Sequence, residues 1–194
     1  MSMVQRIIES IRYRLCKWVK PEMIGFKHWN GAETPGLRIS NMTHLSFPKH
    51  ISFGKNTFIG HFNYIDGYKR VAIGEGVQIT NHVSILTHSS HHALRLLGER
   101  YGTNSEHPVV RTGEVKIGDY TFVGANAVIM PGTTIGKGCI ISAYTYVEGN
   151  VPDYTIMRGI PGIEQGKTTE IDTRLLSIYP ELKSSYYLTG NEHI

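Results

Sequence analysis

Several features that would narrow a function are scarce in this sequence. Its 194 residues include only two cysteines, Cys16 and Cys139, so no disulfide framework is implied and a reducing compartment is indicated. No apolar run approaches the roughly 20 residues of a membrane-spanning helix, and no secretory signal is recognisable at the start. These absences predict one soluble, cytoplasmic domain with a core of useful size.

Charge of one sign is also in short supply. The formal net charge is +4 with neutral histidines, and no basic cluster alternates with aromatic residues as stacking sites for bases would require. We therefore expect no nucleic-acid partner. A mildly basic balance does suit an anionic ligand, such as a cofactor that carries a nucleotide.

The strongest pattern present is a six-residue repeat. Between residues 117 and 147 an aliphatic residue recurs every six positions, and a small or β-branched residue follows four positions after each. The aliphatic set is Ile117, Val123, Ile129, Ile135, Ile141 and Val147, and the second set is Thr121, Ala127, Thr133, Cys139 and Thr145. Neither a helix nor a simple strand has this period.

A period of six fits a coil that turns a corner after every short strand. Each aliphatic side chain would point inward, and the next coil would stack about 4.8 Å above with in-register hydrogen bonds. An ordinary β-meander is the alternative, but it would not hold one frame across six units. The sequence therefore predicts an all-β parallel β-helix, with Cys139 as a buried free thiol.

The same frame extends towards the N-terminus with interruptions. Ile39, Leu45 and Ile51 run in step, as do Ile73, Ile79 and Ile85, and Phe53, Ile59, Ile65 and Val71 form a set offset by two residues. We interpret the slips at 51–53 and 71–73 as bulges or small loops at corners. The pattern is lost over residues 88–111, which we interpret as a loop thrown out from the coil, the usual place for binding residues in repeat proteins.

The two ends of the chain differ from the repeat. Residues 1–20 have the apolar spacing of an amphipathic helix, which would cap the first coil or rest on an anionic membrane surface. Residues 23–37 look like an irregular approach to the first coil. We divide the chain into an N-terminal helix and cap (1–37), a β-helix domain (38–165) and a C-terminal tail (166–194), with a short helix expected over 170–178.

Histidines gather where the loop begins. His88, His91 and His92 lie within five residues, but no Cys, Asp or Glu stands at ligand spacing beside them, so we expect no metal. One histidine suffices for catalysis, because a neutral imidazole can take a proton from an alcohol when a neighbour fixes its tautomer. The aromatic run 58–64 and Tyr68 precede the loop and would stack on a sugar or pack between subunits.

These residues resemble those of the hexapeptide-repeat acyltransferases, in particular the galactoside and maltose acetyltransferase type. The likeness covers roughly residues 50–165 and is close around the histidines, where the family motif is reproduced by His88, His91, His92, Leu94 and Arg95. It implies a left-handed β-helix and a homotrimer, with acetyl-coenzyme A bound in a cleft between neighbouring prisms. The acceptor would be a sugar or glycan.

The resemblance also implies roles for individual residues. His88 matches the general base, and the backbone N–H of Ala125 matches the donor to the oxyanion. Asn63 and Asp66 match acceptor-binding positions, although either could instead be a polar turn at a coil corner. The sequence does not name the partner that orients His88.

On the coenzyme side, Phe122 matches an aromatic flank and Ala143 a backbone contact to the pantetheine arm. Pro161 lies in the glycine-x-proline turn that meets the adenine end in the family. Where the family carries a lysine after the last coil, this chain has Glu148. Three basic residues are then available to meet the coenzyme phosphates: Lys137, Arg158 and Lys167.

Together these features predict an acetyl-coenzyme A-dependent O-acetyltransferase acting on a sugar hydroxyl, in the manner of bacterial surface polysaccharide or lipopolysaccharide biosynthesis. The longer loop favours an acceptor other than a simple galactoside, and the enzyme would lie in the cytoplasm or at the inner membrane face. A sugar N-acetyltransferase is one alternative. A non-catalytic or metal-dependent protein like a carbonic anhydrase is the other, since hexapeptide repeats occur there too.

Overall fold

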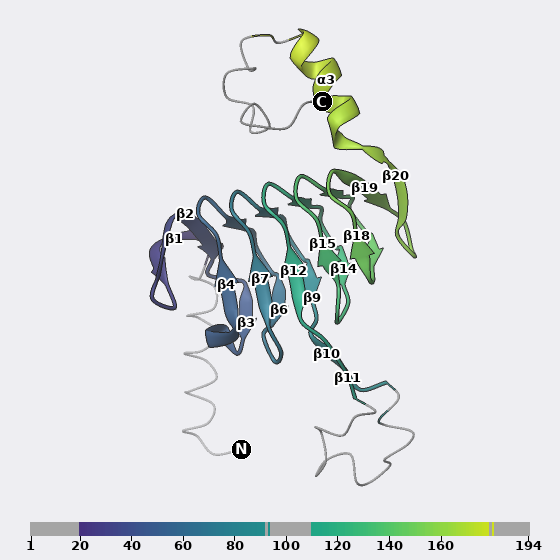
Figure 1. Cartoon of the computed structure of the whole chain (residues 1–194). Helices are drawn as coiled ribbons and strands as arrows, with labels where there is room; N and C mark the ends of the chain where they lie inside the picture. The colour runs from purple at the N-terminus through teal and green to yellow at the C-terminus, as the bar shows by residue number, and fades with distance from the viewer. Residues whose placement is uncertain (1–19, 92, 94–109, 179, 181–194) are drawn as a thin grey trace, which may run out of the picture.

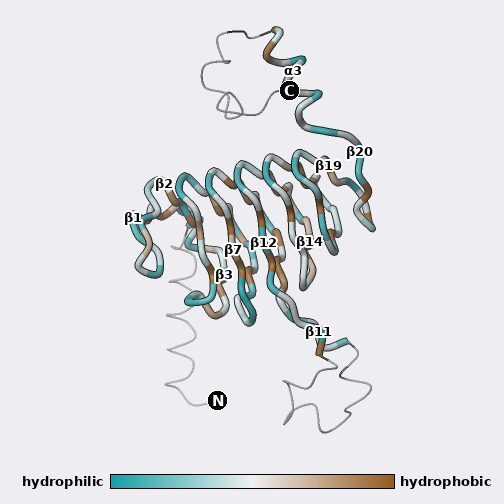
Figure 2. Tube along the Cα trace, viewed as in Figure 1, coloured by the Kyte–Doolittle hydropathy of each residue, from teal (hydrophilic) through white to brown (hydrophobic). Residues whose placement is uncertain are grey.

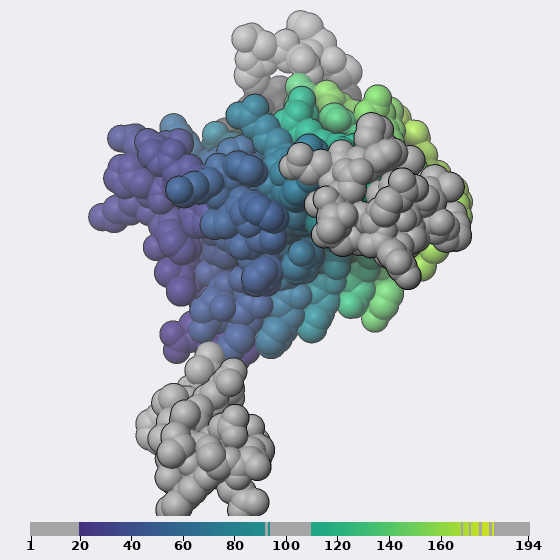
Figure 3. Space-filling view, turned by 90° about the horizontal axis from the view of Figure 1, so that it is seen from below, coloured from purple at the N-terminus to yellow at the C-terminus, as the bar shows by residue number. Residues whose placement is uncertain are grey.

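The computed structural model describes residues 20–91, 93, 110–178 and 180, and it forms a stack of short-stranded coils (Figure 1). Each coil contributes one strand to each of three sheets that run along the stack. This is a left-handed parallel β-helix, as predicted. The coils follow one another in sequence order across the molecule, as the view from below shows (Figure 3).

In each of the three sheets, strands from successive coils lie side by side as hydrogen-bonded neighbours. Sheet A contains β1 (Met23–Trp29), β2 (Ala32–Ser40), β5 (Phe58–Ile59), β8 (Gln78–Ile79), β13 (Phe122–Val123), β16 (Ile140–Ile141), β19 (Thr155–Arg158) and β20 (Ile163–Lys167). Sheet B contains β3 (His44–Ser46), β6 (Tyr64–Asp66), β9 (Ser84–Ile85), β14 (Val128–Ile129) and β17 (Tyr146–Val147). Sheet C contains β4 (Ile51–Phe53), β7 (Val71–Ile73), β12 (Val115–Ile117), β15 (Thr134–Ile135) and β18 (Asn150–Val151).

The six-residue frame places the core as expected. Val123 pairs in register with Ile79 below and Ile141 above, and all three side chains are buried. The small and β-branched set is buried as well, including the free thiol of Cys139. Burial raises the pKa of that thiol. Along the tube in Figure 2, apolar strands alternate with polar corners, as a solvent-exposed coil requires.

The slips predicted at corners are instead part of the strands. Ile51 and Phe53 are both buried from one strand, β4, while Ser52 between them is exposed. Val71 and Ile73 do the same from β7. Because side chains alternate across a strand, a three-residue strand sends two residues inward without any bulge, and the coil gains two residues.

The N-terminal approach is a β-hairpin with one register shift between Phe26 and His28, and not the irregular segment expected. β1 and β2 form an antiparallel hairpin, and Trp29 donates a hydrogen bond from Nε1 to the carbonyl of Ile51 (2.8 Å). The hairpin turns at Asn30 and Gly31, which have positive φ values of 48° and 84°. Asn-Gly is a strong sequence signal for such a turn, so this element could have been predicted. It covers the exposed edge of the first coil.

Antiparallel strand pairs also occur at the C-terminal end of the stack and at the base of the loop. After the last coil, β20 pairs antiparallel with β19 and leads into α3 (Thr168–Ile178), which agrees with the short helix expected there. The loop leaves between sheets B and C through an antiparallel ribbon, β10 (His88–Ser89) with β11 (Arg111–Thr112). A short 3-10 helix, η1 (Pro48–His50), lies on the same corner of an earlier coil. The expected helix over residues 1–20 falls almost entirely outside the described residues.

Close stacking of the coils predicts a large effect of adding one methyl group at a corner. A Cβ on Gly124 would lie 2.5 Å from the backbone nitrogen of Ala143 in the next coil, whereas a Cβ on Gly25 in β1 meets nothing within 4 Å. Gly124→Ala should therefore cost about 1–3 kcal/mol of unfolding free energy, because backbone must shift. Gly25→Ala should change it by less than about 0.5 kcal/mol. Urea unfolding midpoints of both variants would measure this, and equal midpoints would contradict the stacking.

Candidate functional site

The site centres on the corner between sheets B and C, called the B–C corner here and formed, among the described residues, by 47–50, 67–70, 86–91 and 110–114. His88 opens β10 at this corner and pairs with Thr112 across the ribbon. Its side chain is 40% exposed, whereas Thr87 before it is fully buried. The chain therefore anchors one neighbour in the core and leaves the imidazole reachable from solvent.

A buried carboxylate holds this imidazole. Asp66 Oδ2 lies 2.6 Å from His88 Nδ1, and the aspartate side chain is only 1% exposed. Thr87 donates to the same oxygen from its backbone N–H (3.0 Å) and its hydroxyl (2.9 Å). The backbone N–H of Tyr68 donates to Oδ1 (3.0 Å). Both carboxylate oxygens of Asp66 are thus hydrogen-bonded within the fold.

The charge state of Asp66 fixes the tautomer of His88. Burial by itself would raise the pKa of the Asp66 carboxyl group, but the hydrogen bonds from Tyr68, His88 and Thr87 outweigh it and hold the pKa below its usual value. An ionised carboxylate only accepts hydrogen bonds. The proton must then sit on His88 Nδ1, which leaves Nε2 of a neutral ring with a free lone pair. That arrangement is suited to general-base chemistry.

Aromatic rings line the corner beside His88. The ring of Tyr68 lies 5.0 Å from that of His88, and the ring of Phe47 lies 5.8 Å from Tyr68. These three residues occupy the same corner of successive coils and form a ring-lined strip, in which Phe47 is exposed and Tyr68 is half-buried. The expected role of Tyr68 beside a sugar is compatible with this place. Phe62 and Tyr64 of the same aromatic run are exposed at 48% and 39%, but on other parts of the coil.

The structure gives Asn63 a structural role. The side chain is 2% exposed. Its amide nitrogen donates to the carbonyls of Gly60 (3.0 Å) and Thr80 (2.8 Å), and its oxygen accepts from the backbone N–H of Val83 (2.7 Å). Every polar group of Asn63 is thus used at the corner between sheets A and B, which is the geometry of the polar-turn alternative. The side-chain oxygens of both Asn63 and Asp66 are buried and hydrogen-bonded within the fold, so neither faces a sugar that would receive the acetyl group.

Ala125 lies at that A–B corner, formed by residues 60–63, 80–83, 124–127 and 142–145. Its carbonyl accepts from the backbone N–H of Tyr144 (2.9 Å), while its own N–H donates no hydrogen bond within the described part of the chain. Ala125 stands above Asn81, seven positions before His88, which is roughly 20 Å along a strand. One chain alone does not bring the Ala125 amide beside His88.

Most of the residues expected to bind the coenzyme gather near the A–B corner. Ala143 is exposed there one coil after Ala125, and Phe122 is 37% exposed on the outer side of β13. The turn from Gly159 to Gly162, which contains Pro161, stacks on Tyr146, since Tyr146 N–H donates to the Gly159 carbonyl (3.1 Å) and Gly162 N–H to the Tyr146 carbonyl (2.8 Å).

The three expected basic residues are not equivalent. Arg158 is exposed at the end of β19, next to this turn. Lys167 pairs with Glu164 (2.8 Å). Lys137 lies at the third corner, between sheets C and A, with its ammonium over the ring of Tyr154 at 5.4 Å. By position, Arg158 is best placed beside Ala143.

Glu148 is neutralised within the fold. Its carboxylate lies 2.6 Å from Arg111 Nη2 and accepts a hydrogen bond from the Tyr146 hydroxyl (2.7 Å). The hydrogen bond from Arg111 is the main reason that the pKa of Glu148 is lowered, and the same bond raises the pKa of Arg111. The pair ties the end of the loop to the corner of a later coil, a contact that sequence alone did not indicate.

No group of three or more His, Cys, Asp or Glu side chains is placed to hold a metal in the residues that the structure describes. His91 Nδ1 is 2.8 Å from the Ser89 hydroxyl. His92, Leu94 and Arg95 of the histidine motif lie outside those residues, as does most of the loop. Within the same limits, no helix has the length and apolar character needed to cross a membrane.

Comparisons with known proteins agree with the fold. The family model described as bacterial transferase hexapeptide (six repeats) matches residues 114–149. The galactoside O-acetyltransferase of Escherichia coli is 33% identical over 93 residues, covering 47% of this chain and 41% of that protein. WbbJ of the same organism, named for lipopolysaccharide biosynthesis O-acetyl transfer, is 32% identical over 94 residues and 47% of each chain. The chain thus spans less than half of these relatives.

A solved structure extends the likeness. A galactoside acetyltransferase in complex with coenzyme A superimposes with a TM-score of 0.55 at 27% sequence identity, over 68% of this chain and 62% of that one. The shared region is therefore wider in structure than in sequence, because the coil tolerates substitution wherever the inward positions keep their size.

Proposed function

Because the chain belongs to the hexapeptide-repeat acyltransferases, we propose that it transfers an acetyl group from acetyl-coenzyme A to a hydroxyl group of a sugar. The observation that carries this proposal is the His88–Asp66 contact of 2.6 Å at the exposed B–C corner. Relatives named as O-acetyltransferases, and a neighbour that holds coenzyme A, support the choice of donor and acceptor.

In the proposed reaction, Nε2 of His88 removes the proton from the acceptor hydroxyl. The oxygen attacks the thioester carbonyl, the carbon–sulfur bond breaks as the tetrahedral intermediate collapses, and the histidine returns its proton to the coenzyme A thiolate. The products are an acetyl ester and free coenzyme A, so protons and bonds balance. Asp66 is a positioning residue here: it holds the Nδ1 tautomer and stabilises the imidazolium that forms midway.

We further propose that the complete site forms between two copies of the chain, in a homotrimer. His88 and Ala125 lie at different corners of one prism, so a second copy must present its A–B corner for the Ala125 amide to reach the oxyanion. That amide donates no hydrogen bond among the described residues, so it is available for this role. Ala143, Phe122, Arg158 and Pro161 of the same copy would flank the coenzyme.

The acceptor class follows from the relatives rather than from a bound ligand. We propose a sugar of a bacterial surface polysaccharide or lipopolysaccharide precursor, modified in the cytoplasm, where acetyl-coenzyme A is made. Asn63 drops out of the acceptor site, because its polar atoms are already used. The half-buried ring of Tyr68 beside His88 takes its place as the surface on which a sugar could stack.

Release of free thiol from acetyl-coenzyme A, measured against a panel of sugars, oligosaccharides and nucleotide sugars, tests the proposal. We expect thiol release to depend on an acceptor and the product to be cleaved by hydroxylamine, as an ester is. A product that resists hydroxylamine would identify an amide and favour the N-acetyltransferase alternative. Absence of acceptor-dependent thiol release across the panel would count against acetyl transfer to sugars.

A prediction at Ala125 separates backbone from side chain. Ala125→Gly keeps the N–H proposed to bind the oxyanion, so kcat should fall less than about fivefold, whereas loss of an oxyanion donor costs about 10²–10³. Steady-state kinetics of the variant, with its unfolding midpoint as a control for added backbone freedom, would measure this. A loss as large as that caused by removing the His88 imidazole would place the oxyanion donor elsewhere.

A further inference from the structure

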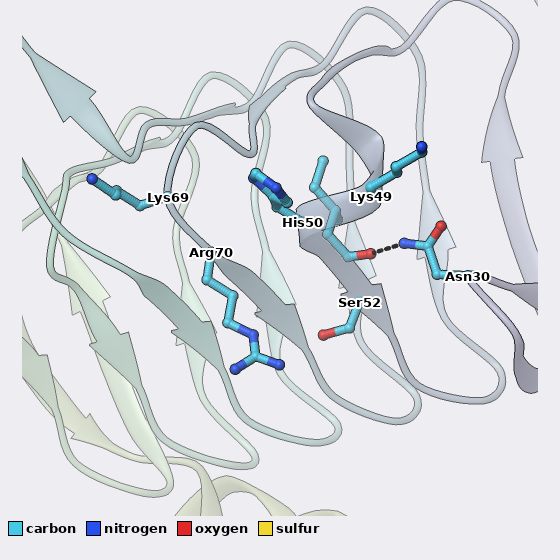
Figure 4. A pocket seen from close by; sticks show the side chains of 7 residues that line it. Asn30, Lys49, His50, Ser52, Lys69 and Arg70 are labelled. Carbon is cyan, nitrogen blue, oxygen red and sulfur yellow. Dashed lines mark hydrogen bonds between the residues drawn. The ribbon is translucent and has the colours of Figure 1, made fainter. Parts of the chain in front are cut away.

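A cavity of about 450 Å³ lies on the N-terminal side of the His88 corner (Figure 4). It is bounded by the β1–β2 turn, η1, the outer side of β4 and the corner that follows β6. Its lining residues are Asn30, Lys49, His50, Ile51, Ser52, Lys69 and Arg70. Four of these seven are basic residue types and none is acidic, although the whole chain has 16 acidic residues against 20 lysines and arginines.

The cations of this pocket have no acidic partners in the described part of the chain. Lys49, Lys69 and Arg70 are exposed, and none of them takes part in an ion pair there. Figure 4 shows the two lysines on either side of His50, with the Arg70 guanidinium and the Ser52 hydroxyl below it. Three like charges around one cavity repel one another, so they are stabilised only when an anion or solvent lies between them.

Hydrogen bonds hold the framework of the pocket, and the Lys69 ammonium lies over the Tyr68 ring at 5.1 Å. His50 is held through Nδ1 to the carbonyl of Gly67 (2.9 Å). Asn30 donates to the carbonyls of Pro48 (2.9 Å) and Ile51 (3.0 Å). Lys69 is fixed at its backbone, where its N–H donates to the Thr87 hydroxyl (3.0 Å). Such a site presents several donors around one point, as phosphate recognition requires.

The same short segment connects this pocket to the catalytic pair. Asp66 contacts His88, Tyr68 lies beside His88, and Lys69 and Arg70 line the pocket. Lys49 and His50 occupy the corner two coils before His88, a displacement of roughly 10 Å at one strand spacing per coil. A sugar ring on Tyr68 with a phosphate on its anomeric carbon spans about this distance.

Resting on the acetyl transfer proposed above, we propose that the acceptor is a glycosyl phosphate or diphosphate. Its phosphate binds in the cavity formed by Lys49, Lys69 and Arg70, and its sugar reaches His88 over Tyr68. The same diphosphate chemistry occurs in nucleotide sugars and in prenyl-linked sugars. The pocket binds the phosphate groups that both sources share. The two sources differ in the nucleoside or prenyl group attached to the other end of the diphosphate.

Direct binding tests the pocket without relying on catalysis. Calorimetric titration of the full chain with inorganic pyrophosphate should show binding that weakens with salt. It should weaken by about tenfold or more in Arg70→Gln, the loss expected for one charge-assisted, bidentate contact. Lys55→Gln is the matched control, because Lys55 is an exposed cation at the corner between sheets C and A, and it should bind pyrophosphate as the wild type does. No binding, or equal weakening in both variants, would overturn the proposal.

Kinetics then connect the pocket to the acceptor. For a glycosyl diphosphate, Arg70→Gln should raise the acceptor KM by about tenfold while leaving the KM for acetyl-coenzyme A unchanged. The unphosphorylated sugar should be a poor acceptor for wild type and variant alike. Assay of one sugar as its nucleoside diphosphate and as its prenyl diphosphate identifies the source. Pyrophosphate binding without any thiol release would contradict the proposed acetyl transfer, whereas thiol release with no effect of Arg70→Gln on acceptor KM would contradict the pocket.

Discussion

His88→Ala is expected to lower kcat for acetyl transfer by about 10³, within the range of 10²–10⁴ that general bases contribute. The side chain is 40% exposed, and among the described residues its polar contact is with Asp66, so its removal should not disturb the coil. The dissociation constant for coenzyme A and the mass of the assembled protein should stay unchanged. Steady-state thiol release, titration of coenzyme A and light scattering would measure the three quantities.

His28→Ala provides a control, because His28 is an exposed histidine in β1, far along the stack from β10. It should retain wild-type kcat. If His88→Ala keeps a kcat within tenfold of the wild type, His88 is not the base. A loss of coenzyme binding together with activity would instead assign His88 to the donor site.

Asp66→Asn should lower kcat almost as much as His88→Ala does, while keeping the shape of the site. An asparagine that turns its amide towards His88 donates to Nδ1, which forces the ring proton onto Nε2 and removes the lone pair that must accept the acceptor's proton. The equivalent change in a serine protease triad costs about 10⁴ in kcat. We expect a loss of about 10²–10³ here, with both KM values nearly unchanged.

Asp119→Asn is the matched control for this change. Asp119 also caps a corner with its carboxylate, accepting from the backbone N–H of Glu75 (2.7 Å), but it lies at the corner between sheets C and A. It should cost stability without slowing the chemistry. The double variant His88→Ala with Asp66→Asn should be no slower than His88→Ala alone, because the two residues act as one unit. Additive losses would separate Asp66 from the base.

The difference in unfolding free energy between the wild type and Asp66→Asn should change with pH in a defined direction. The folded-state pKa of Asp66 is lowered, so its ionised form stabilises the fold above the ordinary carboxyl pKa, and this contribution is lost as the pH falls through the lowered value. Asp66→Asn lacks it. The gap in unfolding free energy between wild type and variant should therefore be largest at neutral pH and begin to close below about pH 4. Urea unfolding across this range would measure the gap, and one that widens at low pH would contradict the assignment.

The sequence by itself determined the six-residue coil and pointed to His88 as the central residue of the candidate site. A hydrophobic period of six is a local property, because each inward residue meets the same packing problem in every coil, so the buried set around Val123 and Ile141 could be predicted position by position. The break at His88 was visible for the same reason. The Asn-Gly turn at Asn30 was equally local, and the hairpin it forms was predictable from that pair.

Only the tertiary structure decided which side chains meet. Asp66 and His88 are 22 positions apart, and their contact depends on a coil of 20 residues, which follows from the pairing of Ile65 with Ile85. A later coil has 18 residues, since Ile129 pairs with Val147, and a coil of that length after Ile65 would have shifted the contact by two residues. Because such contacts depend on coil length and side-chain direction together, the orienting partner of His88, the commitment of Asn63 and the cation pocket beside Arg70 were set by how the coils stack.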